Sequence, residues 1–224
     1  MTEKRFFFSI ILLFVFSTFF PTLSFAFDPY TKYLQNPLTI NSFSNYSNIL
    51  QSNVSYNGIN FESIFSAKRI SDNKYVLLLA NSTNASNWQI IKEALVTNAN
   101  IFAPRMFKIS SNQLLLIYTQ EYPSDHLKIK TIAFDSNYQC DPNSIKLIKD
   151  VLPNTWQSHS VYSGYIVKNN NSYFMFYGGY NGSSRAMGLA TSTDLENWTN
   201  CQSPPIFAQS YDGSFIVQND ASTD

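Results

Sequence analysis

Short apolar runs separated by turn residues make up most of this chain. In the clearest series, runs at residues 164–168, 172–180, 185–191 and 198–201 are separated by an asparagine triplet and by Asn181-Gly182, a strong hairpin signal. No convincing amphipathic helical stretch of ten or more residues occurs. The pattern predicts an all-β protein in which short antiparallel strands come in groups of four.

The series repeats along the chain. A shift of 110 aligns 65–88 with 175–198 without a gap, so that ANSTNASNW falls on ATSTDLENW. A shift of 59 puts 116–118 on 175–177 and Asp135 on Asp194, and a further shift of 50 places 214–217 over 164–167. Groups of four strands that recur at such a period are typical of β-propeller blades. We expect blades at about 51–95, 98–150 and 154–207, and the start of a fourth at 211–224.

A packing role explains the repetition. One four-stranded sheet cannot bury both of its faces alone, whereas sheets packed radially can, and small residues such as Gly188 and Ala190 let neighbouring faces approach closely. The Ser-Thr-x-x-x-Asn-Trp segment would turn the third strand of a blade into the outer one. This interpretation argues against a catalytic role for Asp194 or Trp198.

The segment 1–26 has the three parts of a secretory signal peptide. Lys4 and Arg5 precede an apolar run over residues 6–20, and Ser24-Phe25-Ala26 forms a cleavage site. The alternative is an uncleaved anchor, although the run is shorter than the roughly 18 residues that a spanning helix needs. We expect residues 27–224 to form one exported domain, extracellular or periplasmic, that is free of the membrane after cleavage.

Composition narrows the range of partners. Fifteen basic and fifteen acidic residues cancel, which gives no electrostatic reason to bind nucleic acid or anionic lipid, so we expect a neutral ligand and a monomer. Abundant aromatic residues among many Asn and Ser suit stacking and hydrogen bonding to sugars, but also suit sheet interiors. Cys140 and Cys201 fall at equivalent places in neighbouring repeats, and their pairing stays open. They lack the accompanying ligands of a metal site, and we expect no cofactor.

The segment from residue 173 to 206 resembles the five-bladed propeller glycoside hydrolases, the arabinanase, xylosidase, invertase and levansucrase group. The likeness rests on YFMFYGGY, GLATSTDLENW and SPPI, and more weakly on IFAPRMF at 101–107. It implies hydrolysis or transfer at glycosidic bonds by paired carboxylates, which the family places at the starts of the innermost strands around a central funnel.

Most family positions lack an acid here. The first-blade aspartate falls near Asn53, the second-blade acid after Ala-Pro falls on Arg105, and the third-blade glutamate before glycine falls on Ser163. The remaining catalytic candidates are Asp28 or Glu62, acting with Asp212. We therefore carry three hypotheses: a hydrolase that uses these acids, a propeller that binds carbohydrate without cleaving it, and a truncated reading frame.

The binding candidates lie in the predicted funnel loops and strand starts. An aromatic platform beside hydrogen-bonding side chains suits a sugar ring, although a loop tryptophan can equally pack on a neighbouring blade. The candidates are Arg105, Trp156, His159, Tyr162 and Ser163.

Overall fold

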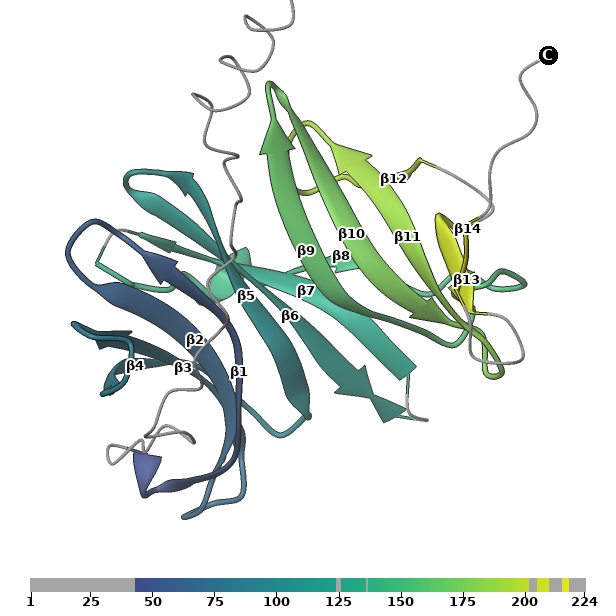
Figure 1. The fold of residues 1–224 in the computed structure, drawn as a ribbon. Helices are drawn as coiled ribbons and strands as arrows, with labels where there is room; N and C mark the ends of the chain where they lie inside the picture. Colours follow the sequence, from purple (N-terminus) through teal and green to yellow (C-terminus); the bar gives the residue numbers. More distant parts are fainter. Residues whose placement is uncertain (1–42, 124–125, 136, 202–204, 210–214, 218–224) are drawn as a thin grey trace, which may run out of the picture. The chain divides into compact units, whose positions relative to one another are not determined.

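The computed structural model describes residues 43–123, 126–135, 137–201, 205–209 and 215–217. The predicted signal peptide at 1–26 lies outside these residues, as do Asp28 and Asp212. The described chain forms three four-stranded antiparallel sheets of the blade type, which confirms the all-β prediction (Figure 1).

Each of the first two sheets is built from strands in chain order. The first contains β1 (Tyr46–Tyr56), β2 (Phe61–Arg69), β3 (Tyr75–Ser82) and β4 (Gln89–Thr97). The second contains β5 (Ile101–Ser110), β6 (Gln113–Tyr122), β7 (His126–Asp135) and β8 (Lys146–Lys149), with the short 3-10 helix η3 (Pro142–Ser144) before β8. The first sheet therefore begins at Tyr46, a few residues before the start that the repeat suggested.

The third sheet continues beyond four strands. Its main strands are β9 (Ser160–Asn169), β10 (Ser172–Tyr180), β11 (Arg185–Ser192) and β12 (Thr199–Asn200). Farther along the chain, β13 (Phe207–Gln209) also pairs with β11, and β14 (Phe215–Val217) pairs with β13. Of residues 211–224, which we expect to open a fourth blade, the structure describes only 215–217; these form β14, which pairs with β13 at the edge of the third sheet (Figure 1).

Three apolar clusters alternate with the three sheets. One cluster, which includes Phe65 and Trp88, lies within the first sheet and its flanks. The second joins Ile64 and Leu79 of the first sheet to Tyr118 of the second, and the third joins the second sheet to residues such as Met175 of the third. Each inner cluster is thus built by two successive sheets, which supports the inference that the sheets stack to bury their faces.

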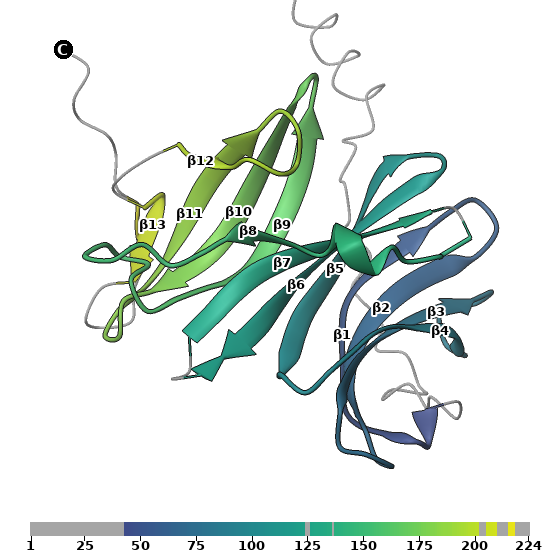
Figure 2. The same cartoon turned by 180° about the vertical axis from the view of Figure 1, so that it is seen from behind.

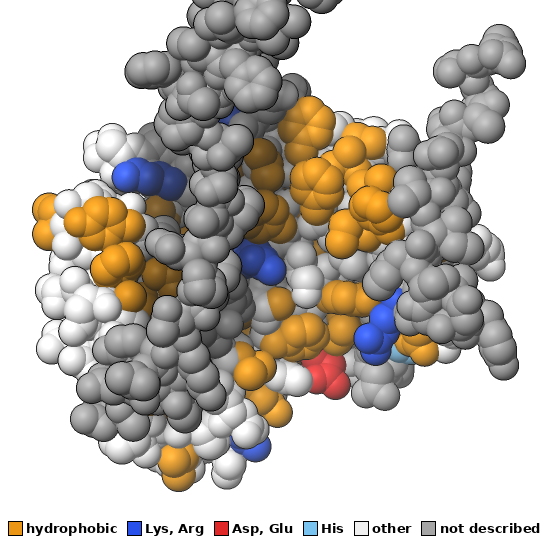
Figure 3. Space-filling model, viewed as in Figure 1, with side chains coloured by type: hydrophobic (Ala, Val, Ile, Leu, Met, Phe, Trp, Pro, Cys, Tyr) orange, Lys and Arg blue, Asp and Glu red, His pale blue; other side chains and the backbone are white. Residues whose placement is uncertain are grey.

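The opposite face of the third sheet is largely bare. On β10 the exposure alternates, since Met175 and Tyr177 are buried while Phe176 between them is 38% exposed. Tyr165 and Val167 of β9 are exposed as well, at 50% and 40%. Figure 3 shows apolar side chains gathered over these strands. This face has the composition of a sheet surface that would normally be covered.

The repeated ANSTNASNW and ATSTDLENW segments form the same turn. Asn84 Oδ1 accepts hydrogen bonds from the backbone N–H groups of Ser86 and Asn87, and Asp194 Oδ1 accepts those of Glu196 and Asn197. In each turn the tryptophan Nε1 donates to a carbonyl three residues earlier, from Trp88 to Ala85 and from Trp198 to Leu195.

The repeated segment therefore has a local structural role. It ends the third strand of the sheet and holds a tryptophan ring in place. The same hydrogen bonds hold the pKa of Asp194 well below its usual range, chiefly those from Asn197. The contacts give Asp194 a structural role.

The gapless alignment hides a difference in register between the two hairpins. Ser82 pairs with Phe61, whereas Ser192, at the equivalent position, pairs with Tyr173, two residues away from the aligned partner. The two turns differ in length. In the first sheet, six residues (69–74) lie between Lys68 and Tyr75, the last pair of the hairpin. In the third sheet, four residues (181–184) lie between Tyr180 and Arg185. Because side chains alternate with a period of two, this offset keeps every residue on its original face.

Asp194 should contribute stability that depends on pH. Its folded pKa lies below the unfolded value of about 3.9, so the contribution is present above that pH and is lost as the pH falls through the folded pKa. Asp194→Asn keeps the Oδ1 acceptor, as Asn84 does in the first sheet, but cannot titrate. We expect wild-type protein to lose more urea resistance than this variant between about pH 7 and about pH 2.

Asp194→Ala serves as the comparison, because it removes the acceptor itself and should lower the urea midpoint at both pH values. Identical acid sensitivity of the wild type and Asp194→Asn would contradict the assignment.

Candidate funnel site

The innermost strands of the three sheets share a β-bulge near their starts. In each bulge one non-glycine residue has a positive φ: 49° at Asn48 in β1, 48° at Ala103 in β5 and 56° at Ser163 in β9. In each bulge the inner strand has one extra residue: it advances three residues between two paired positions while the neighbouring strand advances two. Left-handed backbone is costly for such residues, and bulges re-aim side chains next to functional sites.

The bulges revise the position expected for the first blade. By this geometry Asn48, and not Asn53, is the counterpart of Ala103 and Ser163. Asn53 instead links two strands, since Met106 N–H donates to its Oδ1 at 3.4 Å and its carbonyl accepts from Ser63 Oγ at 2.7 Å. Neither asparagine can act as a carboxylate base.

Ser163 is fixed by the neighbouring sheet. Its N–H donates to Thr119 Oγ1 of β6 at 2.9 Å, and the adjacent Gly164 has side chains of Ile117, Ile129 and Met175 within 3.3 Å of where a Cβ would stand. The glycine at this point is therefore needed for close approach between the second and third sheets.

A hollow of about 530 Å³ lies at the start of β9. It is lined by Phe102, Leu127, His159, Ser160, Tyr162, Tyr180 and Arg185. Two predicted residues, His159 and Tyr162, are thus brought together with side chains from β5, β7, β10 and β11. Aromatic rings, an imidazole and a guanidinium around one hollow suit a small polar ligand that has flat faces.

Two imidazole rings and a tyrosine ring contact one another in sequence beside the hollow. The rings of His126 and His159 lie 4.7 Å apart, and His159 meets Tyr180 edge to face at 5.3 Å. His126 Nδ1 lies 2.5 Å from the carbonyl oxygen of His159, and His159 Nδ1 lies 2.9 Å from Ser160 Oγ. The Arg185 guanidinium lies over the Tyr180 ring at 6.0 Å.

Burial and charge act in opposite directions on Tyr162. Burial raises the pKa of its hydroxyl, and the positive charge of Arg185 lowers it in part. The ring of Tyr162 also lies where a Cβ of Gly178 would stand, which fixes it against β10. Tyr162 is therefore a rigid wall of the hollow within reach of a cation.

Arg105 lies after the bulge of β5. Its guanidinium carbon is 5.2 Å from the centre of the Tyr165 ring on β9, and its Nε is buried without a hydrogen-bond partner among the described residues. A buried N–H of a charged group without an acceptor is costly. Arg105 thus offers an unused donor between two innermost strands.

Trp156 has a packing position. Its ring is stacked on Tyr177 at 5.6 Å and occupies the space where Cβ atoms of Gly179 and Gly188 would stand. Of the two roles considered from the sequence, these contacts favour packing.

Glu62 lies at the other end of the sheet. It follows the β1–β2 turn, and its Oε1 accepts hydrogen bonds from Asn57 Nδ2 and from the Tyr138 hydroxyl. Arg105 and Ser163 lie near the starts of their strands. The β1–β2, β5–β6 and β9–β10 hairpins lie at the opposite end of the three sheets (Figures 1 and 2). Glu62 is therefore not placed to act with them. Burial and the bond to Glu62 raise the pKa of Tyr138.

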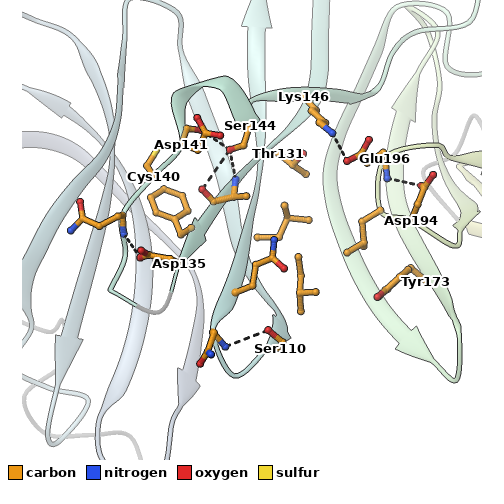
Figure 4. A pocket seen from close by; sticks show the side chains of 18 of the residues that line it. Ser110, Thr131, Asp135, Cys140, Asp141, Ser144, Lys146, Tyr173, Asp194 and Glu196 are labelled. Carbon is orange, nitrogen blue, oxygen red and sulfur yellow. Dashed lines mark hydrogen bonds and ion pairs between the residues drawn. The ribbon is translucent and has the colours of Figure 1, made fainter.

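A larger hollow of about 1020 Å³ lies away from the predicted residues, between the β5–β6 turn, the end of β7 and the segment after β11 (Figure 4). Asp135, Asp141, Asp194 and Glu196 line it, together with Lys146. Their carboxylates are engaged in turns or, for Glu196, in an ion pair with Lys146. This hollow is acidic, in contrast to the one at β9.

His126 and Arg185 were missed as site residues by the sequence analysis. The protein has only two histidines, 33 positions apart, and nothing in their spacing indicates that their rings meet. Arg185 directly follows the Asn181-Gly182 hairpin that the sequence does predict, so its place at the start of a strand was readable.

Among the described residues, neither the cysteines nor the metal-binding side chains form a further candidate site. Cys140 and Cys201 are both free, and burial raises the pKa of the Cys140 thiol. Among the described residues no group of three or more metal-binding side chains occurs. In the same residues no helix is long and apolar enough to cross a bilayer.

Solved structures share this arrangement of sheets. A thermostable family-43 glycoside hydrolase matches with a TM-score of 0.60 at 15% identity, over 71% of this chain and 55% of its own. A β-1,2-mannobiose phosphorylase from Listeria innocua matches at 0.57 and 15%, over 72% and 45%. A Bombyx mori GH32 β-fructofuranosidase matches at 0.57 and 15%, over 76% and 37%. The chain has part of the fold of the five-bladed propeller glycoside hydrolases.

This likeness confirms the resemblance at the level of fold. The propeller described here spans about half the length, or less, of these matched structures. Neither a protein-family model nor a curated protein matches the sequence.

Trp156 and Gly188 form a matched test of the packing role. Gly188→Ala would place a Cβ 2.5 Å from the Trp156 ring and 2.8 Å from Tyr177, and should destabilise the fold by about 1–3 kcal/mol. Trp156→Ala should cost about 3 kcal/mol by opening a cavity. Urea unfolding measures both. A Trp156→Ala protein as stable as the wild type would show that the indole serves a ligand and not the core.

Proposed function

We propose that the protein is an exported carbohydrate-binding propeller whose ligand occupies the hollow at the start of β9. The observation that carries this proposal is the hollow itself, where Tyr162, Tyr180 and His159 surround a space of about 530 Å³ at the bulged end of an inner strand. Aromatic rings that carry polar groups recognise both the flat face and the hydroxyls of a sugar.

Known proteins of this fold support the choice of ligand class. One matched structure is a β-1,2-mannobiose phosphorylase in complex with β-1,2-mannobiose. Others are described as glycoside hydrolases, such as the family-43 enzyme. A carbohydrate is therefore the first class of ligand to test.

Binding without cleavage agrees better with the residues present. Glycoside hydrolysis needs two carboxyl groups that flank the scissile bond, one protonated and one ionised. The family positions carry Asn48 or Asn53, Arg105 and Ser163 instead, and Glu62 lies at the far end of its sheet. A hydrolase would depend on Asp28 and Asp212, which lie outside the described residues.

The segment 1–26 supports export, and cleavage after Ala26 is directly measurable. We expect the N-terminal sequence of protein secreted from an expressing cell to begin Phe27-Asp28-Pro29. A full-length chain that begins at Met1 and stays with the membrane fraction would support the anchor alternative.

Glycan binding tests the proposed site. Purified protein should bind at least one member of a panel of plant and microbial oligosaccharides, measured by calorimetry. His159→Ala and Tyr162→Ala should each weaken that binding about tenfold, the effect of losing about 1.4 kcal/mol of contact. Phe176→Ala, on the bare face of the third sheet, is the control and should bind as the wild type does.

Activity assays with chromogenic glycosides separate binding from catalysis. Chromogenic arabinosides, xylosides and fructosides should show no turnover. Turnover abolished by Asp212→Asn would establish the hydrolase in place of the binding protein, and a folded protein that binds no glycan would overturn the proposal.

A further inference from the structure

We infer that the ligand of the β9 hollow is an acidic sugar, one that bears a carboxylate or a sulfate ester, recognised by Arg185 beside the rings of His159 and Tyr180. This inference rests on the proposed carbohydrate site and adds the charge of its ligand. The neutral composition of the whole chain led us to expect a neutral ligand, but the charges are not evenly distributed.

Arg185 is the principal cation of the hollow. It lines the space and is exposed, and no ion pair or hydrogen bond joins its guanidinium to any described residue. It lies over the face of the Tyr180 ring, which positions the guanidinium without neutralising it, and its charge acts on the Tyr162 hydroxyl. A planar guanidinium that is held but unpaired suits a bidentate contact with a carboxylate or sulfate.

His159 adds a polar ring beside it, since it lines the hollow and meets Tyr180 edge to face. The Nδ1 atoms of His126 and His159 are occupied by the His159 carbonyl and by Ser160 Oγ. His126 Nδ1 must donate to that carbonyl, so Nε2 of its neutral ring accepts, and His126 is not among the residues that line the hollow. The two imidazole rings also present flat faces next to Tyr180.

Arg105 is a second unpaired cation on the neighbouring inner strand. Its Nε is buried without an acceptor, and no ion pair joins Arg105 to a described residue. It stands where the hydrolase pattern has an acid, so the substitution reverses the sign of charge at that position. An extended acidic oligosaccharide that reached from the hollow toward β5 would meet this charge.

The described lining of the hollow carries no negative charge. No aspartate or glutamate is among its described lining residues. Glu121 lies nearby, opposite Leu127 in the β6–β7 pairing, but its Oε2 accepts a hydrogen bond from Asn100 Nδ2 at 2.9 Å. The larger hollow is lined by four acids and one lysine. The two hollows therefore differ in the sign of their charge, and an anion is favoured only at the one beside β9.

The test compares acidic oligosaccharides with their neutral counterparts. One pair is an oligogalacturonate and its carboxyl-reduced form, and the other is a sulfated galactan oligosaccharide and its desulfated form. We expect the acidic member of at least one pair to bind at least tenfold more tightly, with an affinity that falls as salt is added. The pair that shows the difference identifies the anionic group.

Arg185→Gln should remove that preference, because it should weaken binding of the acidic member at least tenfold more than binding of its neutral counterpart. Lys168→Gln is the matched control, because it makes the same charge change on the third sheet, where Lys168 lies over Tyr173 at 5.6 Å, away from the hollow. It should keep the preference.

The outcomes separate this inference from the proposed function. If acidic and neutral sugars bind equally, and His159→Ala weakens both, the carbohydrate site stands and the acidic ligand is wrong. Equal effects of Arg185→Gln and Lys168→Gln would also overturn the inference. If no sugar of either kind binds, the proposed function fails and the inference fails with it.

Discussion

The burial of each sheet face against the next sheet is the constraint on which the rest of this structure depends. A single four-stranded sheet leaves both apolar faces in water, so successive sheets share clusters such as the one that joins Ile64 to Tyr118. Small residues make the contacts possible. Gly164 admits Ile117, Ile129 and Met175, and Gly188 admits Trp156. The candidate site is a consequence of this stacking, because only stacked sheets bring the starts of the inner strands together.

The bulges show how a packing scaffold presents chemistry. The positive φ angles at Asn48, Ala103 and Ser163 recur in three strands whose sequences differ at these positions, so the backbone device is kept while the side chains vary. A fold that carries paired carboxylates in the hydrolases can in this way hold an asparagine, an alanine or a serine at the bulges. That separation of backbone from side chain explains how this chain can share the fold and still lack a carboxylate at the bulge positions.

The predicted site residues that line the hollow are those whose position follows from the sequence next to them. His159 and Tyr162 lie in the hollow because both belong to the short segment that leads into or begins β9. Trp156 belongs to the same loop, yet its ring reaches the core, since the glycines that receive it lie on β10 and β11. Glu62 was a candidate because it is one of the few acids near the start of the first repeat, but strand pairing places it beside the β1–β2 turn.

The sequence by itself determined the strands, the repeat and the turns, because each depends on neighbours within a few positions. Alternation of period two, Asn-Gly at a hairpin and an acceptor at Asn84 or Asp194 act locally. Only the tertiary structure decided which distant residues meet. The contact of His126 with His159, the position of Arg185 beside Tyr180, and the pairing of β14 with β13 depend on strand register and on sheet stacking. These arise from long-range burial, which no short stretch of the chain encodes.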